Sequence, residues 1–381
     1  MMAPDYSASI VNLVTTIAGA LGGKGTDYPP LSSGTGGMGL SDRPLVLLII
    51  DGLGDLFLQN FPDSFLCRHR QGRLSSVFPT TTATAVTSFF TGVGPQQHAI
   101  TGWHTYFKEL GAVSTVLPFR PRYGGTCFSG EGISPARLVD HPSLLDSLEV
   151  ACHVILPNQL VDSVYSRTLC GRAGRHGYDS AAAMFAAIRR LAVPGCPALV
   201  VAYWPEFDHL AHNHGVASEE VTNHFLVLDR ACAETLEPLA KCGVSVMVTA
   251  DHGLIDTCEH HTIHLEDHPE LAATLTLPLC GEPRCAYCYV RADRVELFER
   301  YVEERLGFAC DLRRSADLVS QGFFGRGPAS PRLAERVGEY VLLMKDDYVI
   351  RDRLLTEKPS SQVGVHGGLS VEELYVPLIV L

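Results

Sequence analysis

The chain has 381 residues, of which 46% are hydrophobic and 19% charged, and its formal net charge is -12. The length and apolar content predict a globular protein with one large domain, or with one domain that carries an insertion. The acidic balance argues against a nucleic-acid scaffold, which presents a basic face, but small phosphorylated substrates remain possible because bound metal ions can supply positive charge.

The first predicted element is an amphipathic helix within residues 7–22. Its apolar residues follow helical spacing and two glycines end the run. The apolar residues are Ile10, Leu13, Ile17 and Leu21. Residues 23–43 are rich in Gly, Ser and Pro, which is typical of a loop or linker. We therefore expect residues 1–39 to form a helix and linker that dock on a body formed by residues 40–381.

Four short apolar runs predict buried strands. They cover residues 44–50, 197–203, 244–250 and 376–381. Helices are expected between them, including residues 180–192 and 217–240. Alternation of buried strands and helices predicts an α/β protein with a doubly wound, mostly parallel sheet flanked by helices.

A long stretch, residues 265–360, precedes the last of these strands. We expect part of it to form a small cap or insertion that shapes a substrate pocket. Helices are predicted near residues 294–305 and 330–338.

Asp51, Asp208 and Asp251 lie at or just past the ends of the first three strands. Ligands bind at the carboxyl ends of such strands, so these side chains are expected to converge. Three neighbouring carboxylates resist ionisation unless a cation neutralises them. His252 follows Asp251, and His212 lies four residues after Asp208, on the same face of a helix. Asp and His together suit zinc, with manganese as an alternative, whereas each aspartate alone equally suits a helix cap.

Residues 78–88, FPTTTATAVTS, predict a turn followed by a helix from about 83 to 91. Free N–H groups and the positive end of the dipole at a helix N-terminus favour a phosphoryl oxygen. Thr82 is a candidate nucleophile there if a metal lowers the pKa of its hydroxyl, although a simple threonine cap gives the same pattern. His366 lies among glycines that would let it approach a metal, but taken alone it is better explained by a surface loop.

In this order, the motifs resemble the type I phosphodiesterase and nucleotide pyrophosphatase family of the alkaline phosphatase superfamily. The pattern is an Asp after an early strand, a Pro-x-x-Thr segment, Asp-x3-His, Asp-His-Gly and a late His-Gly-Gly, across roughly residues 44–381. The resemblance implies an alkaline phosphatase-like fold, with residues 40–381 as the catalytic domain. It also implies a hydrolase of phosphodiesters or nucleotide pyrophosphates.

The resemblance implies a role for each motif. Thr82 matches a nucleophile that forms a phospho-threonine, assisted by two divalent metal ions, expected to be zinc with manganese as the alternative. One ion would be bound by Asp51, Thr82, Asp251 and His252. The other would be bound by Asp208, His212 and His366.

Three positions bear on the substrate. Tyr203 matches a tyrosine that stacks on the base in nucleotide-cleaving members of the family. Ala83 and Trp103 depart from the pattern, because those members have an aromatic residue after the nucleophile and an Asn, which helps hold a phosphoryl oxygen, about where Trp103 lies. The departures weigh against nucleotide diesters and make Trp103 and His104 candidate pocket residues, with core packing as the alternative for each.

Other activities remain as alternatives. A phosphomonoesterase or phosphonate hydrolase of the same superfamily is the first of these. A sulfatase is disfavoured because position 82 holds neither Cys nor Ser, and a phosphomutase because the chain is short for its usual inserted domain. The non-enzymatic alternative is a catalytically silent relative that binds metal or ligand, against which the complete ligand set argues.

Three weaker signals involve cysteine and histidine. Cys285 and Cys288 have metal-ligand spacing, but their strand-like surroundings favour buried thiols. Four histidines follow the Asp-His-Gly motif, where a polar loop is the main interpretation and a metal or substrate role the minority one. They are His260, His261, His264 and His268. His214 is a candidate for supporting the ligand His212.

The sequence also predicts a compartment. Twelve cysteines are spread through the chain instead of forming the dense framework of a small secreted domain. The segment MMAPDY has no basic n-region, and the apolar run at 44–50 is too short to span a bilayer. We expect a cytoplasmic protein with reduced thiols that acts on a small phosphorylated substrate, without nucleic acid or membrane as a partner, and with its oligomeric state open.

Overall fold

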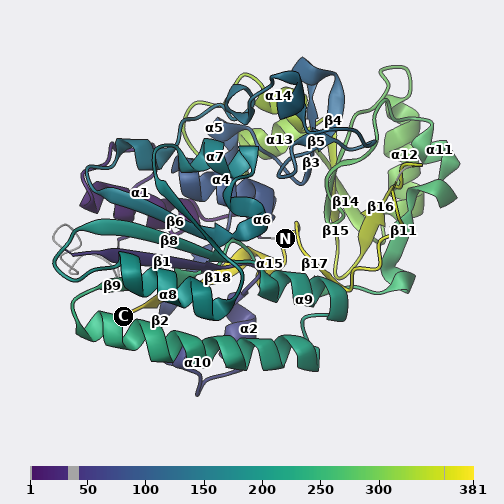
Figure 1. Cartoon of the computed structure of the whole chain (residues 1–381). Helices are drawn as coiled ribbons and strands as arrows, with labels where there is room; N and C mark the ends of the chain where they lie inside the picture. The colour runs from purple at the N-terminus through teal and green to yellow at the C-terminus, as the bar shows by residue number, and fades with distance from the viewer. Residues whose placement is uncertain (1, 33–42, 356) are drawn as a thin grey trace.

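The computed structural model describes residues 2–32, 43–355 and 357–381. Two seven-stranded sheets dominate it, and Figure 1 shows the second of them at the upper right of the first. Within the described ranges, no helix is long and apolar enough to cross a membrane.

The first sheet is the expected α/β sheet. From edge to edge its strands are β2 (Arg70–Ser75), β18 (Tyr375–Val380), β9 (Ser245–Thr249), β1 (Leu45–Ile50), β8 (Ala198–Trp204), β6 (Ala151–Pro157) and β7 (Gly174–Tyr178). The five strands from β9 to β7 run parallel, and β18 is antiparallel to β9 and to β2. The predicted mostly parallel sheet is confirmed.

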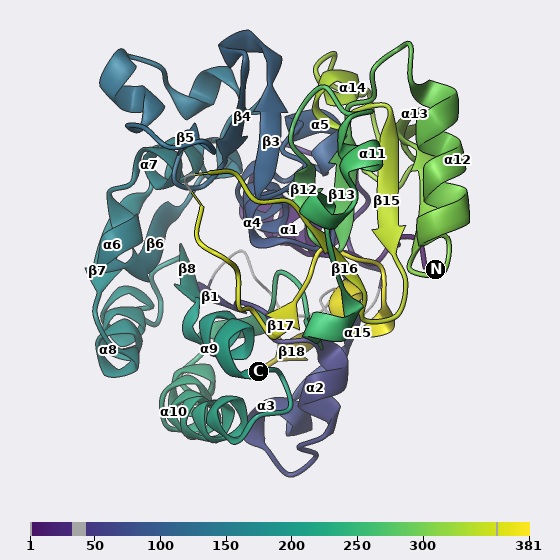
Figure 2. The ribbon, with the colours of Figure 1, turned by 90° about the vertical axis from the view of Figure 1, so that its right-hand side faces the viewer.

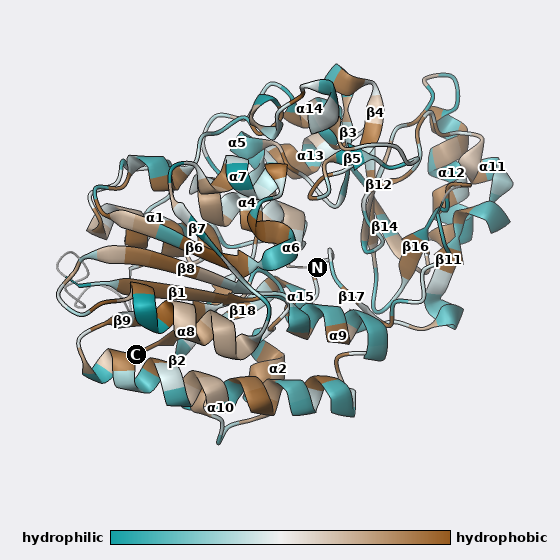
Figure 3. Cartoon of the chain, viewed as in Figure 1, coloured by the Kyte–Doolittle hydropathy of each residue, from teal (hydrophilic) through white to brown (hydrophobic). Residues whose placement is uncertain are grey.

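The central strand β1 and its two neighbours determine where the site residues meet. All six of its residues, LVLLII, are buried, because β1 pairs with β8 on one side and β9 on the other while helices cover both faces. Figure 3 shows these strands as an apolar layer between helices. The parallel register places the carboxyl ends of β1, β8 and β9 side by side, so the residues that follow them meet at one edge.

Helices cover the two faces of this sheet (Figure 1). One face carries α8 (Ala181–Leu191), α9 (Glu206–His214) and α10 (Glu219–Lys241), and the other carries α1 (Ile10–Ala20) and α4 (Thr82–Thr91). The shorter helices around the sheet are α2 (Asp55–Gln59), α3 (Phe65–Arg68), α5 (Pro95–His98), α6 (Asn158–Val161), α7 (Val164–Cys170) and α15 (Val371–Leu374).

The second sheet is antiparallel and draws on two separate parts of the chain (Figure 2). Its strands in order are β14 (Cys310–Arg314), β15 (Tyr340–Met344), β13 (Cys285–Cys288), β12 (Cys280–Glu282), β3 (His104–Phe107), β4 (Ala112–Thr115) and β5 (Arg120–Pro121). Four strands come from the segment 265–360, where we expected a cap, and three come from 104–121, where we predicted no strand. The accompanying helices are α11 (Pro269–Ala272), α12 (Val295–Leu306), α13 (Ser315–Ser320) and α14 (Leu333–Arg336).

Two small ladders complete the described strands. In one, β10 (Ile255–Asp256) pairs with β17 (Gly364–Val365) in antiparallel orientation. In the other, β11 (Thr262–His264) pairs with β16 (Val349–Arg351) in parallel orientation. These ladders tie the loop after the Asp-His-Gly motif to the last part of the chain.

The N-terminal helix α1 forms where its apolar spacing predicts. Ser9 caps it in a reciprocal capping box with Asn12, and most of the helix is buried against the body. Part of the predicted linker, residues 33–42, lies outside the described residues. The boundary between residues 1–39 and 40–381 therefore stays a prediction.

Candidate active site

The carboxyl ends of the central strands bring the predicted acidic residues together. Asp51 follows β1, Asp251 follows β9, and Asp208 lies in the first turn of α9 just after β8. Nε2 of His252 lies 3.4 Å from Oδ1 of Asp51 and 3.8 Å from Oδ2 of Asp251. Nε2 of His212 lies 3.1 Å from Oδ2 of Asp208, one helical turn earlier. The convergence expected from parallel-strand topology is therefore present.

A glycine turn makes this approach possible. Gly52 has a φ of +77°, and a Cβ atom at this position would lie 2.5 Å from Leu254 and 3.0 Å from Cβ of Asp208. Only a residue without a side chain fits such a left-handed turn at that distance. The backbone of Gly52 also donates a hydrogen bond to Oδ1 of Asp251, at 3.1 Å.

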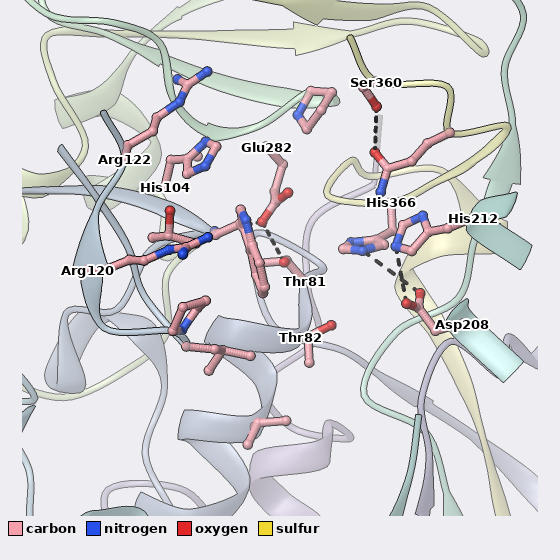
Figure 4. A pocket seen from close by; sticks show the side chains of 18 of the residues that line it. Thr81, Thr82, His104, Arg120, Arg122, Asp208, His212, Glu282, Ser360 and His366 are labelled. Atoms are coloured by element: carbon pink, nitrogen blue, oxygen red, sulfur yellow. Dashed lines mark hydrogen bonds and ion pairs between the residues drawn. The ribbon is translucent and has the colours of Figure 1, made fainter. Parts of the chain in front are cut away.

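The late histidine joins the group from a distant part of the chain. His366 lies between β17 and α15, and its Nε2 is 4.0 Å from Oδ1 of Asp208. Its ring stacks on that of His252, with centroids 3.9 Å apart. Figure 4 shows His366 and His212 both directed toward Asp208.

All three histidines are oriented in the same way. Nδ1 of His212 lies 2.7 Å from the carbonyl of Gly364, and Nδ1 of His366 lies 3.0 Å from the carbonyl of Thr80. Nδ1 of His252 lies 3.1 Å from the carbonyl of Gly253. A carbonyl oxygen only accepts, so each Nδ1 carries a proton, and in the neutral form of each imidazole Nε2 keeps a lone pair. This arrangement is typical of metal-binding imidazoles.

The carboxylates show that a cation fits here. Oδ1 of Asp51, Oδ1 of Asp208 and Oδ2 of Asp251 are buried without a hydrogen-bond partner among the described residues. Burial raises the pKa of Asp51 well above its usual range, and the charges of Asp251 and Asp208 raise it further. Burial opposes ionisation of Asp208 as well, but when no metal is bound the positive charge of protonated His212, with contributions from the other two histidines, lowers its pKa. Unpartnered buried oxygens are costly, and divalent cations would satisfy them.

Thr82 is the first residue of α4, one position before the predicted start of that helix. Its Oγ1 lies 3.1 Å from Nε2 of His252. Thr81 occupies the N-cap position with an extended φ of -143°. The Thr82 hydroxyl is therefore placed among the free N–H groups of the first helical turn and beside the carboxylate cluster.

A cavity of about 1380 Å³ opens over this group (Figure 4). Trp103, His104, Tyr203 and Arg120 line it together with the candidate metal ligands. Burial, with a contribution from Arg122, lowers the pKa of His104 to about 3, so this imidazole is neutral. The hydroxyl of Tyr203 donates to Oδ2 of Asp51 and its ring is buried, which leaves little surface for stacking on a base.

Glu282, at the end of β12, is a pocket residue that we did not predict. Its Oε1 accepts hydrogen bonds from Oγ1 of Thr81 at 2.6 Å and from the backbone N–H of Trp103 at 2.7 Å. Burial raises its pKa to about 7. Figure 4 shows its carboxyl directed at Thr81, beside the candidate nucleophile. No local motif marks this glutamate, because its importance comes from contacts with Thr81 and Trp103, which lie far from it in the sequence.

Two weaker signals lie outside this site. Cys285 and Cys288 are buried in different hydrophobic clusters, so their thiols lie on opposite faces of β13 and cannot share one ion. All twelve cysteines lie in the described residues and have free thiols. His214 lies 4.0 Å from Glu220 and is partly exposed, so it does not support the ring of His212.

The comparisons with known proteins agree with this geometry. The type I phosphodiesterase / nucleotide pyrophosphatase family matches residues 45–369. No curated protein matches the chain.

Solved structures of similar fold cover most of the chain. Murine ectonucleotide pyrophosphatase / phosphodiesterase 5 superposes with a TM-score of 0.65 at 14% identity, over 88% of this chain and 87% of that one. An inactive threonine-to-alanine variant of the murine protein, in complex with AMP, gives a TM-score of 0.64 at 14% identity, with the same coverage. Phosphonoacetate hydrolase from Sinorhizobium meliloti 1021, in complex with phosphonoacetate, gives 0.64 at 18% identity, over 89% and 90% of the two chains.

A mostly parallel α/β sheet with an Asp/His cluster at its carboxyl edge, together with this family match, identifies a phosphoric ester hydrolase. More specifically, the chain belongs to the type I phosphodiesterase / nucleotide pyrophosphatase family, whose match covers most of its length.

Proposed function

We propose that the chain hydrolyses phosphodiester or pyrophosphate bonds through a phospho-threonine formed on Thr82. The observation that carries this proposal is the position of the Thr82 hydroxyl at the N-terminus of α4, beside unpartnered carboxylate oxygens and 3.1 Å from Nε2 of His252. The inactive threonine-to-alanine variant of the murine relative gives further support.

Seven residues of the chain would hold two divalent cations, preferably zinc, with manganese as the alternative. The first set is Asp208, His212 and His366, whose ligand atoms lie within 4.8 Å of one another. The second set is Asp51, Asp251, His252 and Thr82. Such ions, when bound, neutralise charge and lower the pKa of a coordinated hydroxyl or water.

In the proposed reaction, groups of the chain itself supply the nucleophile and bind the phosphoryl group. Oγ1 of Thr82, deprotonated, attacks phosphorus in line with the leaving oxygen, so that one P–O bond forms as the ester or anhydride P–O bond breaks. The backbone N–H groups of the first turn of α4 hold a phosphoryl oxygen. Hydroxide from water next attacks the phospho-threonine from the opposite side and releases Thr82 and the phosphorylated product.

One observation favours a second candidate, a phosphonate hydrolase. Arg120 lines the cavity and forms no ion pair within the described part of the chain. Figure 4 shows it on the side of the pocket away from Asp208. A free guanidinium there suits a substrate with a second negative group, such as a carboxylated phosphonate, better than it suits a simple diester.

The nucleophile is tested by comparing Thr82→Ala with Thr82→Ser. We expect Thr82→Ala to bind metal but to lose at least about a thousandfold in turnover, because no nucleophilic oxygen remains. Thr82→Ser keeps a hydroxyl and should retain measurable turnover, and acid-quenched wild type should show phosphate on Thr82 by mass spectrometry. An Ala variant with most of its activity would show the assignment to be wrong.

The bond that is cleaved is tested with a substrate panel. Rates on a bis-aryl phosphate, a nucleotide pyrophosphate, an aryl monophosphate and a carboxylated phosphonate should be measured with zinc and with manganese. We expect the diester or the pyrophosphate to be the best substrate. Preference for the phosphonate would favour the second candidate, and no turnover of any substrate with metal bound would indicate a silent binding protein.

A further inference from the structure

We propose that Cys258, His261 and Asp347 form a third metal site, separate from the candidate active site, that binds zinc or a similar thiolate-binding cation. One ligand atom from each of these residues lies within 4.8 Å of the other two. None of the three belongs to the seven residues assigned above. The site does not depend on the proposed reaction.

The fold brings the two halves of this site together. Cys258 and His261 lie at the two ends of a helical turn, where the N–H of His261 donates to the carbonyl of Cys258 at 3.0 Å. Asp347 comes from a turn almost 90 residues later in the chain. The parallel pairing of β11 with β16 aligns Thr262 with Val349, so the residues just before each strand lie beside one another.

Further contacts hold the ligands in place. Oγ1 of Thr257 donates to the carbonyl of Asp347 at 2.7 Å, and Oγ1 of Thr262 donates to the carbonyl of Cys258 at 3.1 Å. The ring of Tyr348 packs against that of His261, with centroids 4.4 Å apart. Support of this kind orients ligand side chains before a metal binds.

The imidazole of His261 lies close to the carboxylate of Asp347 but is not hydrogen-bonded to it. Its Nδ1 lies 2.7 Å from Oδ1 of Asp347, but without the alignment of a hydrogen bond. This nitrogen is sealed from solvent and has no hydrogen bond among the described residues. A cation close to both atoms would satisfy the nitrogen and the carboxylate together.

The ligand chemistry selects the ion. Zinc bonds of about 2.0–2.3 Å in tetrahedral geometry place neighbouring ligand atoms roughly 3.3–3.8 Å apart, so these three require only small movements. A thiolate, a carboxylate and a neutral imidazole together balance a divalent charge. The thiolate disfavours magnesium and calcium, and solvent can occupy the fourth position because Cys258 is exposed.

The third metal site lies at the start of two strands that reach the wall of the large cavity. The paired strands β11 and β16 end in His264 and Arg351, and both of these residues line the large cavity. An ion held by Cys258, His261 and Asp347 would clamp the start of both strands and so stiffen this wall of the pocket.

Cobalt tests the site directly, because a cobalt–thiolate bond gives a near-ultraviolet charge-transfer band and none of the seven proposed ligands of the candidate active site is a cysteine. The full chain, stripped of metal with a chelator, is titrated with Co²⁺. We expect three equivalents to bind, one of them with the thiolate band. Cys258→Ser should bind two equivalents without the band, and His261→Ala should weaken the band-forming equivalent at least about tenfold.

Two controls separate the possible outcomes. Cys242→Ser removes another exposed thiol and should leave the band unchanged. A variant with Asp208→Asn and His366→Ala should lose one equivalent of cobalt from the candidate active site and keep the band, so the two proposals can fail separately. A band that survives in Cys258→Ser, or a wild type without the band, would overturn the third site.

Discussion

Single residues at this site are constrained by buried charge. Glu282 is the clearest example, because it is a carboxyl group enclosed between Thr81 and Trp103 with a pKa raised to about 7. A neutral carboxylic acid can donate a hydrogen bond to a phosphoryl oxygen, whereas a carboxylate would repel it. A neutral Glu282 would therefore offer a hydrogen-bond donor beside Thr81 and Trp103.

Replacement of Glu282 by Gln should change how stability depends on pH. A raised pKa means that the folded state holds the proton more tightly, so the wild type loses stability as pH rises from about 4.5 to 7 and then levels off. The 2.5-unit difference corresponds to roughly 3 kcal/mol at most. Gln does not titrate, so the unfolding free energy of Glu282→Gln relative to wild type should increase across this window.

Urea unfolding of both metal-free proteins between pH 4.5 and 8 measures this difference, in which the contributions of other titrating groups cancel. A constant difference at every pH would show that Glu282 does not hold a proton in the folded state.

Among the elements, the C-terminal loop and helix α15 are fastened to the second sheet by one buried ion pair. Arg284 follows β12 and contacts both carboxylate oxygens of Glu373 in α15, at 3.3 and 3.0 Å. The same carboxylate accepts the backbone N–H of Gly368 at 2.7 Å. Gly367, with a φ of +115°, lets this loop pass close to Glu282, where a Cβ would lie 2.5 Å from that of the glutamate. The pair thus positions the loop that carries His366.

The substitution Arg284→Ala should destabilise the protein by about 3–5 kcal/mol, because it leaves the buried charge of Glu373 unpaired. It should also weaken metal binding through His366. The matched control is Arg294→Ala, which breaks an exposed pair with Asp293 and should cost less than about 1 kcal/mol. Chemical unfolding of the three proteins measures the effect, and equal stability of the two variants would contradict the assigned role of Arg284.

On the scale of the whole molecule, the candidate site joins the two sheets. The first sheet supplies the aspartates, while the second supplies Glu282, His104 and Arg120 across the cavity (Figure 4). Cations bound at this site would therefore link parts of the chain that lie far apart in the sequence, from near residue 51 to near residue 366. Binding to the folded state alone stabilises it by mass action.

Metal removal should lower both activity and stability. Exhaustive chelation is expected to abolish turnover, and zinc or manganese should restore it. Each occupied site should add about 2.7 kcal/mol when free metal is a hundredfold above its Kd. Thermal unfolding at increasing zinc concentrations measures this stabilisation. In Asp208→Asn, the unfolding temperature should rise less with zinc than it does in the wild type. Turnover that persists after verified metal removal would end the two-metal proposal.

Local sequence patterns determined the class of fold and the main candidate residues. The continuous apolar runs of β1, β8 and β9 indicated strands buried on both faces, and parallel strands place the residues that follow them at one edge. For the same reason the positions of Asp51, Asp208 and Asp251 relative to one another followed from topology alone. Cys285 and Cys288 were likewise readable as buried thiols of a strand.

Tertiary structure decided what no local pattern encodes. The short strands β3 and β5 carry polar residues and too few apolar ones to show a periodicity, so their place in the second sheet depends on β12, which lies far along the chain. The environment of Glu282 and the meeting of His261 with Asp347 depend in the same way on contacts between distant segments. Burial and side-chain direction arise only when such segments pack, and therefore the pocket and the candidate third metal site could be recognised only in the folded chain.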